Sequence, residues 1–180
     1  MMSQIQPHFL YNTLATIRAL CCVDAEKAGE MTEKFGEYLR QNLDSLGNTG
    51  LIPFRKELEH TRIYADIEMV CFENLRVEYD IQDDAFALPP LTLQPIVENA
   101  FTHGFREAAE KVLRIEVEVK NALIIRVTNS GATLSPQEYY AVNQAIRGNT
   151  AHGLSMVNHK LQGAYDERYD IRIGDRKSVV

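Results

Sequence analysis

The chain lacks an excess of basic residues, a long apolar run and a secretion signal. Its formal net charge is −6, and no stripe of lysine and arginine is present. This argues against a nucleic-acid backbone as a partner, because neutralising phosphates requires clustered basic side chains. No segment approaches the ~20 apolar residues of a membrane-spanning helix, and the N-terminus has no basic-then-apolar pattern. We therefore expect this chain itself to be cytoplasmic.

Cysteine is also scarce, since only Cys21, Cys22 and Cys71 are present. Their spacing is not that of metal ligands, and adjacent residues such as Cys21 and Cys22 point about 100° apart on a helix. We expect all three cysteines to be reduced and to pack as small apolar residues.

The composition is that of a folded protein. With 180 residues, 45% of them hydrophobic and 24% charged, the chain can form one core, or one core with a helical appendage. It has no internal repeat and no low-complexity segment. A glycine-containing break at 47–50 divides the pattern, which predicts a helical region at 1–48 and an α/β region at 51–180. The expected fold class is therefore α+β.

The first region is predicted to be a helical hairpin. One helix spans 4–22, Asp24 caps a second helix, and that second helix ends near 46. Each helix has an apolar stripe: Leu10, Leu14, Ile17 and Cys21 on the first, and Ala28, Met31, Phe35, Tyr38, Leu39, Leu43 and Leu46 on the second. A two-helix hairpin cannot cover both stripes alone. We expect a four-helix bundle with a second copy of the chain, the alternative being packing onto the chain's own second region.

The second region mixes helices and strands. Apolar and polar residues alternate in three segments, 75–81, 113–119 and 123–127, and the last two read as an antiparallel hairpin turning at 121–122. Helical spacing and helix-start residues predict the other elements: a helix from Pro53 to about 71, one opened by Pro89 and Pro90 and capped by Gly104, and others at 135–147 and from Gly153. Short strands are expected at 170–173 and 178–180.

Two runs of residues carry a more specific signal. The first, QIQPHFLYNTL, lies at the N-terminus, and the second, LPPLTLQPIVENAFTHG, follows about ninety residues later. Together they resemble the autolysin-sensor (LytS/YehU-like) family of bacterial sensor histidine kinases. The resemblance covers most of the chain and weakens after about residue 129. It implies a histidine-bearing hairpin followed by a two-layer ATP-binding sandwich of the GHKL (Bergerat) type.

In that family the histidine of the PHFxxN motif accepts the γ-phosphoryl group of ATP, which assigns this role to His8. Helical spacing places Asn12 one turn further on, where its amide can position a water against a phosphorylated imidazole. The position after the histidine often carries an acid in other histidine kinases, but here it is Phe9. The base that assists His8 is therefore unassigned. Considered without the family, His8 and Asn12 also fit a solvated helix surface.

The second run resembles the N box of GHKL proteins. Asn99 and His103 lie on one helix face, together with Thr92, and the resemblance assigns Mg²⁺ binding to Asn99 and phosphate binding to His103. Glu98 lies about 100° away around the helix, where it can orient Mg²⁺-bound water or His8. The alternative is that Glu98 and Asn99 are on an exposed helix and bind nothing.

The glycine boxes of the family are only partly present. The expected Asp-x-Gly-x-Gly is Asn129-Ser130-Gly131-Ala132-Thr133, which keeps Gly131 but replaces the acid with Asn129. The second box keeps Gly153 and Leu154, where backbone N–H groups at a helix start can bind phosphate. Near the C-terminus, Lys177-Ser178 replaces a common Gly-Thr. The segment 132–151 is expected to be a lid over ATP.

The resemblance implies a sensor histidine kinase that uses ATP and Mg²⁺, forms a homodimer, and passes the phosphoryl group to an aspartate of a response-regulator receiver domain. It also implies a longer protein anchored in the bacterial inner membrane. Two alternatives remain open. The degenerate boxes fit a signalling dimer that binds ATP weakly, and Glu98-Asn99 fits a GHKL ATPase, which leaves PHFLYN unexplained.

Overall fold

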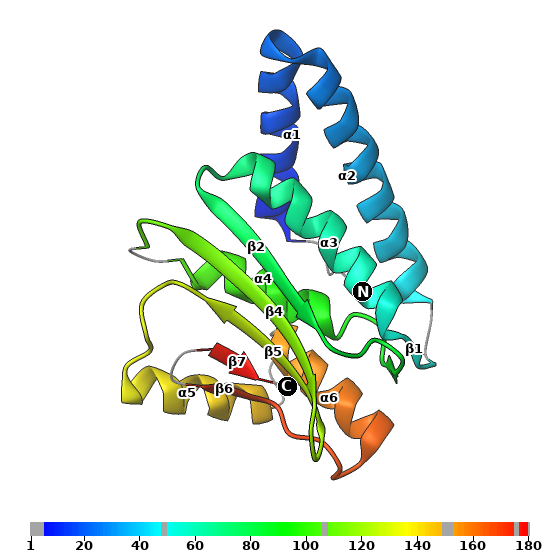
Figure 1. Ribbon diagram of the computed structural model, residues 1–180, viewed down its shortest axis with the longest axis vertical. Helices are drawn as coiled ribbons and strands as arrows, with labels where there is room; N and C mark the ends of the chain where they lie inside the picture. The colour runs from blue at the N-terminus through cyan, green and yellow to red at the C-terminus, as the bar shows by residue number, and fades with distance from the viewer. Residues whose placement is uncertain (1–5, 48–49, 106–107, 149–152, 175–176, 180) are drawn as a thin grey trace.

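The computed structural model describes residues 6–47, 50–105, 108–148, 153–174 and 177–179. Figure 1 shows a long helical hairpin beside a twisted sheet that carries helices on one side. The elements are α1 (Pro7–Val23), α2 (Ala25–Leu46), β1 (Ile52–Pro53), α3 (Phe54–Cys71), β2 (Leu75–Ile81), β3 (Ala87–Leu88), α4 (Leu93–His103), β4 (Lys111–Val119), β5 (Leu123–Asn129), α5 (Pro136–Arg147), α6 (Gly153–Tyr165), β6 (Arg172–Gly174) and β7 (Lys177–Val179). The α+β prediction is confirmed. Within the described ranges, no helix is long and apolar enough to cross a membrane.

The hairpin forms where the sequence predicts it. Asp24 ends α1 and caps α2, because its carboxylate accepts a hydrogen bond from the backbone N–H of Lys27 at 3.0 Å. The N-terminal boundary differs from the prediction of a helix starting at residue 4. Gln6 is the N-cap and Pro7 the first helical residue, a position that suits proline because its missing N–H has no partner there. Residues 4 and 5 lie outside the described ranges.

The predicted packing stripe of α1 is only partly correct, because Leu10 and Ile17 are partly buried against the core but Leu14 and Cys21 are exposed. The buried residues of this helix are Phe9 and Thr13, whereas Leu14 is 54% exposed. Cys21 and Cys22 are exposed as well, so they are not packed as expected, and Cys71 is partly buried. The helix is rotated toward its aromatic residue because a phenylalanine ring buries more apolar area than a leucine or cysteine side chain.

The first part of the α2 stripe is buried within the same chain, whereas Leu43 near its end is 65% exposed. Met31 and Phe35 are 3% and 8% exposed and belong to the continuous core that also contains Tyr64 of α3. The expectation that Met31 and Phe35 face a second copy is therefore wrong. This face of the hairpin instead packs onto the second region of the same chain, which was the alternative expectation. The division of the chain into 1–48 and 51–180 as domains stays a prediction.

A five-stranded sheet forms the base of the second region. Its strand order is β2-β4-β5-β7-β6, in which β2 and β4 are parallel and the other neighbours are antiparallel. A separate pair, β1 and β3, is antiparallel. At the centre of the sheet, Ile115 of β4 is opposite Tyr79 on one side and Val127 on the other. The predicted hairpin of β4 and β5 is confirmed.

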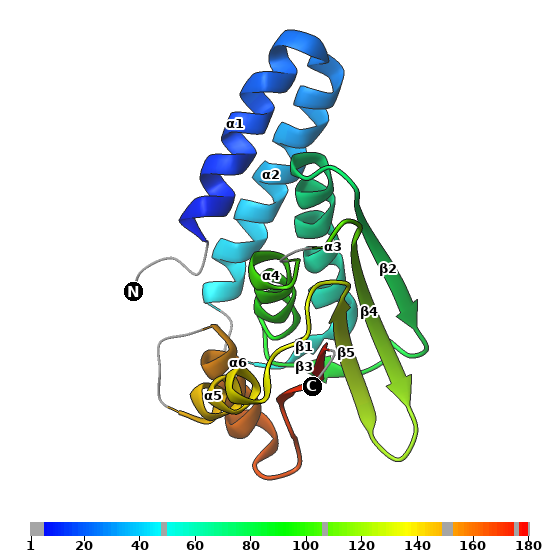
Figure 2. The same cartoon turned by 90° about the vertical axis from the view of Figure 1, so that its left-hand side faces the viewer.

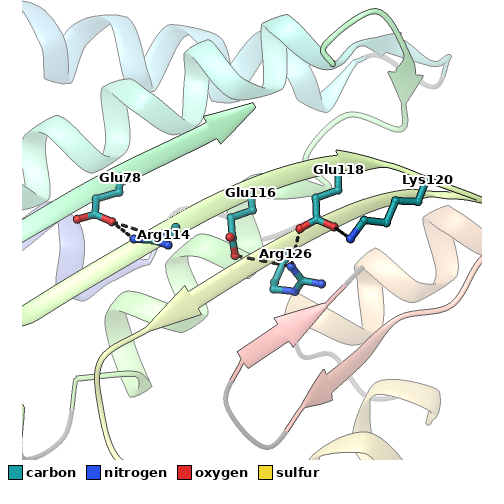
Figure 3. A network of polar contacts seen from close by, with 6 residues as sticks. All are labelled: Glu78, Arg114, Glu116, Glu118, Lys120 and Arg126. Atoms are coloured by element: carbon teal, nitrogen blue, oxygen red, sulfur yellow. Dashed lines mark hydrogen bonds and ion pairs between the residues drawn. The ribbon is translucent and has the colours of Figure 1, made fainter. Parts of the chain in front are cut away.

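The two faces of the sheet differ in polarity. Leu113, Ile115 and Val117 of β4 are fully buried, on the face that packs against helices. The opposite face carries a network of charges (Figure 3), with the ion pairs Glu78–Arg114, Glu116–Arg126, Glu118–Arg126 and Glu118–Lys120. Partly exposed pairs of this kind contribute ~1 kcal/mol or less each. The network therefore marks the solvent-facing side and adds little to stability.

A buried carboxylate determines where α4 begins. The side chain of Glu57, in α3, accepts hydrogen bonds from the backbone N–H groups of Leu91, Thr92 and Leu93 at 2.6, 2.9 and 3.0 Å. Leu91 has a positive φ of 57°, an uncommon conformation for a leucine, which turns the chain into the helix. Sequence reasoning placed the helix start at Pro89 and Pro90, but the helix begins only at Leu93. The Glu57 cap was not expected.

Candidate functional site

The predicted phosphoacceptor is accessible at the start of α1. His8 is exposed, and the side-chain nitrogen of Asn12, one turn later, lies 3.2 Å from His8 Nδ1 and 3.3 Å from Nε2. An amide N–H donates to a ring nitrogen that carries no proton, and the tautomer decides which of the two nitrogens that is. A neutral, solvent-accessible imidazole is the form that can act as a nucleophile.

The predicted metal and phosphate ligands lie on α4. Asn99 is half-buried and His103 is exposed, four residues apart on one helix face. Among the described residues, neither side chain has a hydrogen-bond partner. Thr92 does not join them, since it is the N-cap and is buried, with its hydroxyl donating to the Pro89 carbonyl at 2.6 Å. The structure thus leaves an amide and an imidazole free on one face.

Glu98 points in a different direction. It is 6% exposed and faces the hairpin, where its Oε1 accepts from the Tyr38 hydroxyl at 3.3 Å and from Gln94 Nε2 at 2.6 Å. The alternative that Glu98 lies on an exposed surface is therefore wrong. Its expected catalytic role, orienting water or His8, stays a prediction. In this conformation the carboxyl group is hydrogen-bonded to Tyr38 and Gln94, to which we assign no catalytic role.

The surroundings of Glu98 favour its neutral form. Burial raises the pKa of this carboxyl to about 7, with a smaller contribution from the charge of nearby Glu68, while the hydrogen bonds from Gln94 and Tyr38 act in the opposite direction. Burial also raises the pKa of Tyr38 well above its usual value, so this phenol remains a donor. The hairpin and α4 therefore meet at an acid that titrates near neutral pH.

We expect Glu98→Gln to change how stability depends on pH. The folded protein holds the Glu98 proton up to pH about 7, whereas the unfolded chain releases it near the usual pKa of 4.5. The folded state thus binds more protons between these values, and this carboxyl lowers the free energy of unfolding as pH rises from about 4.5 to 7. Glutamine keeps the shape without the charge, so the variant should be about 2 to 3 kcal/mol more stable than the wild type at pH 8 and nearly equal to it at pH 5.

Urea unfolding of both proteins across this pH range measures the difference. Glu33→Gln, on the exposed side of α2, is the matched control and should follow the wild type. The buried Glu57 is present in all three proteins, so its contribution cancels in the comparison, whereas the effect of the Glu68 charge on the pKa of Glu98 is part of the measured difference. Parallel curves for Glu98→Gln and the wild type would contradict the buried, protonated state of Glu98.

The remnant of the first glycine box packs against the end of α4. Asn129 Oδ1 accepts a hydrogen bond from the backbone N–H of Gly131 at 3.1 Å. A Cβ at Gly104 would collide with the Asn129 side chain, and one at Gly131 would collide with the Gly104 carbonyl. Both glycines are therefore required by close approach. They bring Asn129 next to the helix that carries Asn99 and His103. Gly104 is the C-cap of this helix, as predicted.

The remnant of the second box begins α6. Gly153 is the first residue of this helix and is exposed, while Leu154 is buried in the core. A Cβ at Gly153 would meet Pro95 of α4 at 3.6 Å, an ordinary contact, so this start of α6 lies beside α4. Of the predicted lid 132–151, residues 136–147 form α5, which Ser135 begins with a capping box. Residues 149–151 lie outside the described ranges.

Sequence reasoning missed the polar residues between the hairpin and α4. Gln94 precedes Glu98 by one turn, so helical spacing alone could have linked the two. Tyr38 and Asn42 belong to α2, and Gln94 Nε2 donates to the Tyr38 hydroxyl at 3.0 Å. No local pattern connects residues that are so distant in the sequence. Tyr38 was instead expected to be one member of an apolar stripe.

The sequence is similar to those of known histidine kinases. A family model described as histidine kinase matches residues 1–76. YwpD of Bacillus subtilis (strain 168) is 42% identical over 165 residues, covering 89% of this chain and 59% of that protein. The sensor histidine kinase YpdA of Escherichia coli (strain K12) is 33% identical, covering 94% of this chain and 31% of YpdA. The sensor protein LytS of Bacillus cereus (strain ATCC 14579) is 31% identical, covering 95% of this chain and 30% of LytS. The chain thus spans between about a third and three fifths of these relatives.

Solved structures show the same fold. The histidine kinase domain of the blue-light activated kinase EL346 from Erythrobacter litoralis matches with a TM-score of 0.54 at 14% identity, over 96% of this chain and 89% of that domain. The catalytic domain of the histidine kinase ThkA matches with a TM-score of 0.54 at 14% identity, over 72% of this chain and 90% of that domain. With both sequence runs in place on this fold, the chain belongs to the sensor histidine kinase family of LytS, YpdA and BtsS and contains its catalytic core.

Proposed function

We propose that the chain transfers the γ-phosphoryl group of ATP to His8 and from there to an aspartate of a response-regulator receiver domain. The observation that carries this proposal is the exposed His8 at the first turn of α1, with the Asn12 amide beside its ring. The nucleotide would bind beside α4, where Asn99 and His103 lie with Asn129 and the start of α6 nearby. Asn12 then serves to position water for dephosphorylation.

Mg²⁺ fits the residues of α4. The half-buried Asn99 offers an amide oxygen, and the described residues contain no group of three His, Cys, Asp or Glu side chains that could hold a metal ion alone. This suits an ion that keeps several waters and is shared with nucleotide phosphates. We propose Asn99 as the protein ligand and His103 as a donor to a phosphate oxygen. The ion would neutralise charge on the triphosphate.

Incubation with γ-labelled ATP tests the function. Phosphohistidine survives alkali and hydrolyses in acid, so the expected result is an acid-labile label on the wild type and none on His8→Gln. Addition of a receiver domain should then remove the label from the chain. His159→Gln, which replaces an exposed histidine of α6, is the matched control and should be labelled as the wild type is.

The second candidate is a signalling dimer with little catalysis. Asn129 in place of the acid favours it. ATP binding without label on the protein would support this reading, whereas ATP turnover without label would indicate an ATPase.

We expect Asn129→Asp to tighten ATP binding by about fivefold, because a charged acceptor makes a stronger hydrogen bond to the adenine amino group, worth roughly 1 kcal/mol. The same change should weaken GTP, since a carboxylate cannot donate to the guanine O6 as an amide can. Calorimetric titrations of both nucleotides measure the ratio. Asn121→Asp, in the turn after β4, is the control. An unchanged ATP-to-GTP ratio would remove Asn129 from the base site.

The homodimer is proposed to form through the exposed residues of the hairpin. Tyr11, Leu14 and Leu43 are 74%, 54% and 65% exposed, and the family resemblance implies a four-helix bundle. The longer protein to which this core belongs is proposed to be anchored in the bacterial inner membrane, as the resemblance implies.

We expect Leu14→Glu to weaken the dimer by about 30-fold, because a carboxylate without a partner in a packed seam costs roughly 2 kcal/mol. The fold of each chain should be unaffected, since Leu14 is half exposed within it. Analytical ultracentrifugation measures the dissociation constant, and Leu123→Glu, at the start of β5, is the control. Equal dimer affinity for Leu14→Glu and wild type would show that this face is not the seam.

A further inference from the structure

The first turn of α1 lies against α4 of the same chain. The Thr102 hydroxyl of α4, which also lies 2.9 Å from the Glu98 carbonyl, shares its hydrogen with Gln6 Oε1 at 3.2 Å. Thr102 directly precedes His103, and Gln6 is two residues before His8. In Figure 2 the start of α1 lies beside the upper part of α4, and the helices α5 and α6 lie below α4. The segment that precedes His8 therefore contacts the residue next to His103 on α4.

An aromatic cluster fixes this arrangement. Phe9, next to His8, is 3% exposed, and its ring centroid lies 4.8 Å from that of Tyr64. The Tyr64 ring in turn meets Phe101 of α4 edge-on, with centroids 5.4 Å apart. The edge-to-face contact of Tyr64 with Phe101 is favourable beyond the area it buries, while the rings of Phe9 and Tyr64 are tilted by 40°. The backbone that carries His8 is thus held at the C-terminal half of α4.

The other helix of the hairpin is joined to α4 as well. The Tyr38 hydroxyl donates to Glu98, the residue before Asn99. The connection between α2 and α3 comprises residues 47–53, which span at most about 25 Å at ~3.5 Å per residue. This connection limits the distance between the hairpin and the catalytic region of its own chain. The Tyr38–Glu98 hydrogen bond and the short α2–α3 connection both keep the hairpin that carries His8 close to α4 of the same chain.

We infer that His8 receives its phosphoryl group from ATP bound by its own chain, and not from ATP bound by a partner subunit. This inference rests on the proposed function. The unprotonated ring nitrogen of His8 attacks the γ-phosphorus and forms the N–P bond, while the bond from that phosphorus to the β,γ-bridging oxygen breaks. ADP leaves with the electron pair of that bond, and the imidazole proton is released to water, to which His8 is open. Thr102 and Gln6 act as positioning residues.

Two mixed dimers of the full chain distinguish the routes, each purified through different tags on its two subunits. In the first, His8→Gln is paired with Asn99→Ala, so that each subunit lacks one partner of the reaction. In the second, a wild-type subunit is paired with a subunit that carries both substitutions. Transfer within a chain predicts no label on the first dimer and half the wild-type label on the second. Label on the first and none on the second would overturn the inference.

The wild-type homodimer separates this inference from the proposed function. If it takes no acid-labile label from ATP, the function fails; if it is labelled, the mixed dimers decide the route. The initial rate per chain should also be independent of protein concentration over a 100-fold range, including concentrations at which the dimer dissociates. A rate that falls on dissociation would contradict transfer within one chain.

The positioning contact has its own test. Thr102→Val removes the hydroxyl, and we expect the rate of His8 labelling at saturating ATP to fall about fivefold while the ATP dissociation constant stays the same. Thr102→Ser keeps the hydroxyl and should restore the rate. A merely structural role would change ATP binding as well. An unchanged rate for Thr102→Val would contradict positioning by this contact.

Discussion

Glu57→Ala is expected to lower the free energy of unfolding by about 4 kcal/mol, because three buried backbone N–H groups lose their acceptor and each unpaired group costs ~1–3 kcal/mol. Glu57 is 2% exposed, and Leu91, Thr92 and Leu93 all donate to it. Backbone torsions at Leu91 add to the effect, since its positive φ is held in place by this hydrogen bond. The carboxylate also lies at the positive end of the α4 dipole.

Urea unfolding measures the loss. Glu59→Ala, two residues further along α3, is the matched control because Glu59 is exposed; it should change stability by less than about 0.5 kcal/mol. Glu57→Gln retains one acceptor oxygen and should fall between the two. If Glu57→Ala unfolds at the same urea concentration as Glu59→Ala, the capping role of this carboxylate is wrong.

Asn99→Ala is expected to weaken ATP binding in the presence of Mg²⁺ by about 100-fold, equivalent to ~2.7 kcal/mol. The amide oxygen is the one protein ligand that we propose for the metal, and its loss leaves the ion with nucleotide and water alone. Stability should change little, since the Asn99 side chain has no hydrogen bond within the described part of the chain. The loss should largely disappear when both proteins are titrated without Mg²⁺.

Isothermal titration with and without Mg²⁺ measures this difference. Asn121→Ala, in the turn between β4 and β5, carries the same substitution at an exposed site away from α4 and should bind as the wild type does. Equal affinities of Asn99→Ala and Asn121→Ala for Mg-ATP would exclude Asn99 from the metal site.

Local patterns predicted the secondary structure well, because the period of apolar residues and the capping residues act within a few positions. The β4–β5 hairpin and the Asp24 cap are examples. The face on which α1 packs could not be predicted in the same way. Leu14 fits an apolar stripe as well as Phe9 does, and the choice depends on Tyr64, which is fifty residues away in the sequence. Tertiary partners decide between such faces.

For the candidate site too, the sequence motifs indicated which residues to consider but not how tertiary packing orients them. The motifs proposed His8, Asn12, Asn99 and His103 as site residues; in the structure His8 is exposed beside Asn12, and Asn99 and His103 share one face of α4. The motifs did not indicate that Glu98 is buried against Tyr38. A motif identifies the residues that are present, but not the direction in which each side chain points. Glu57 was missed for a related reason. A carboxylate in the middle of a helix has no local sign that it caps another helix.

The parallel pairing of β2 with β4 has a consequence for how the molecule folds. These strands are neighbours in the sheet, but α4 lies between them in the sequence. The two strands can align only after the connecting segment has crossed one face of the sheet, a slow step because the chain loses entropy before the distant contacts form. The helix that carries Asn99 and His103 is that connection. We therefore expect the nucleotide site to mature together with the central sheet during refolding, so that ATP binding appears in a single kinetic phase with burial of the sheet.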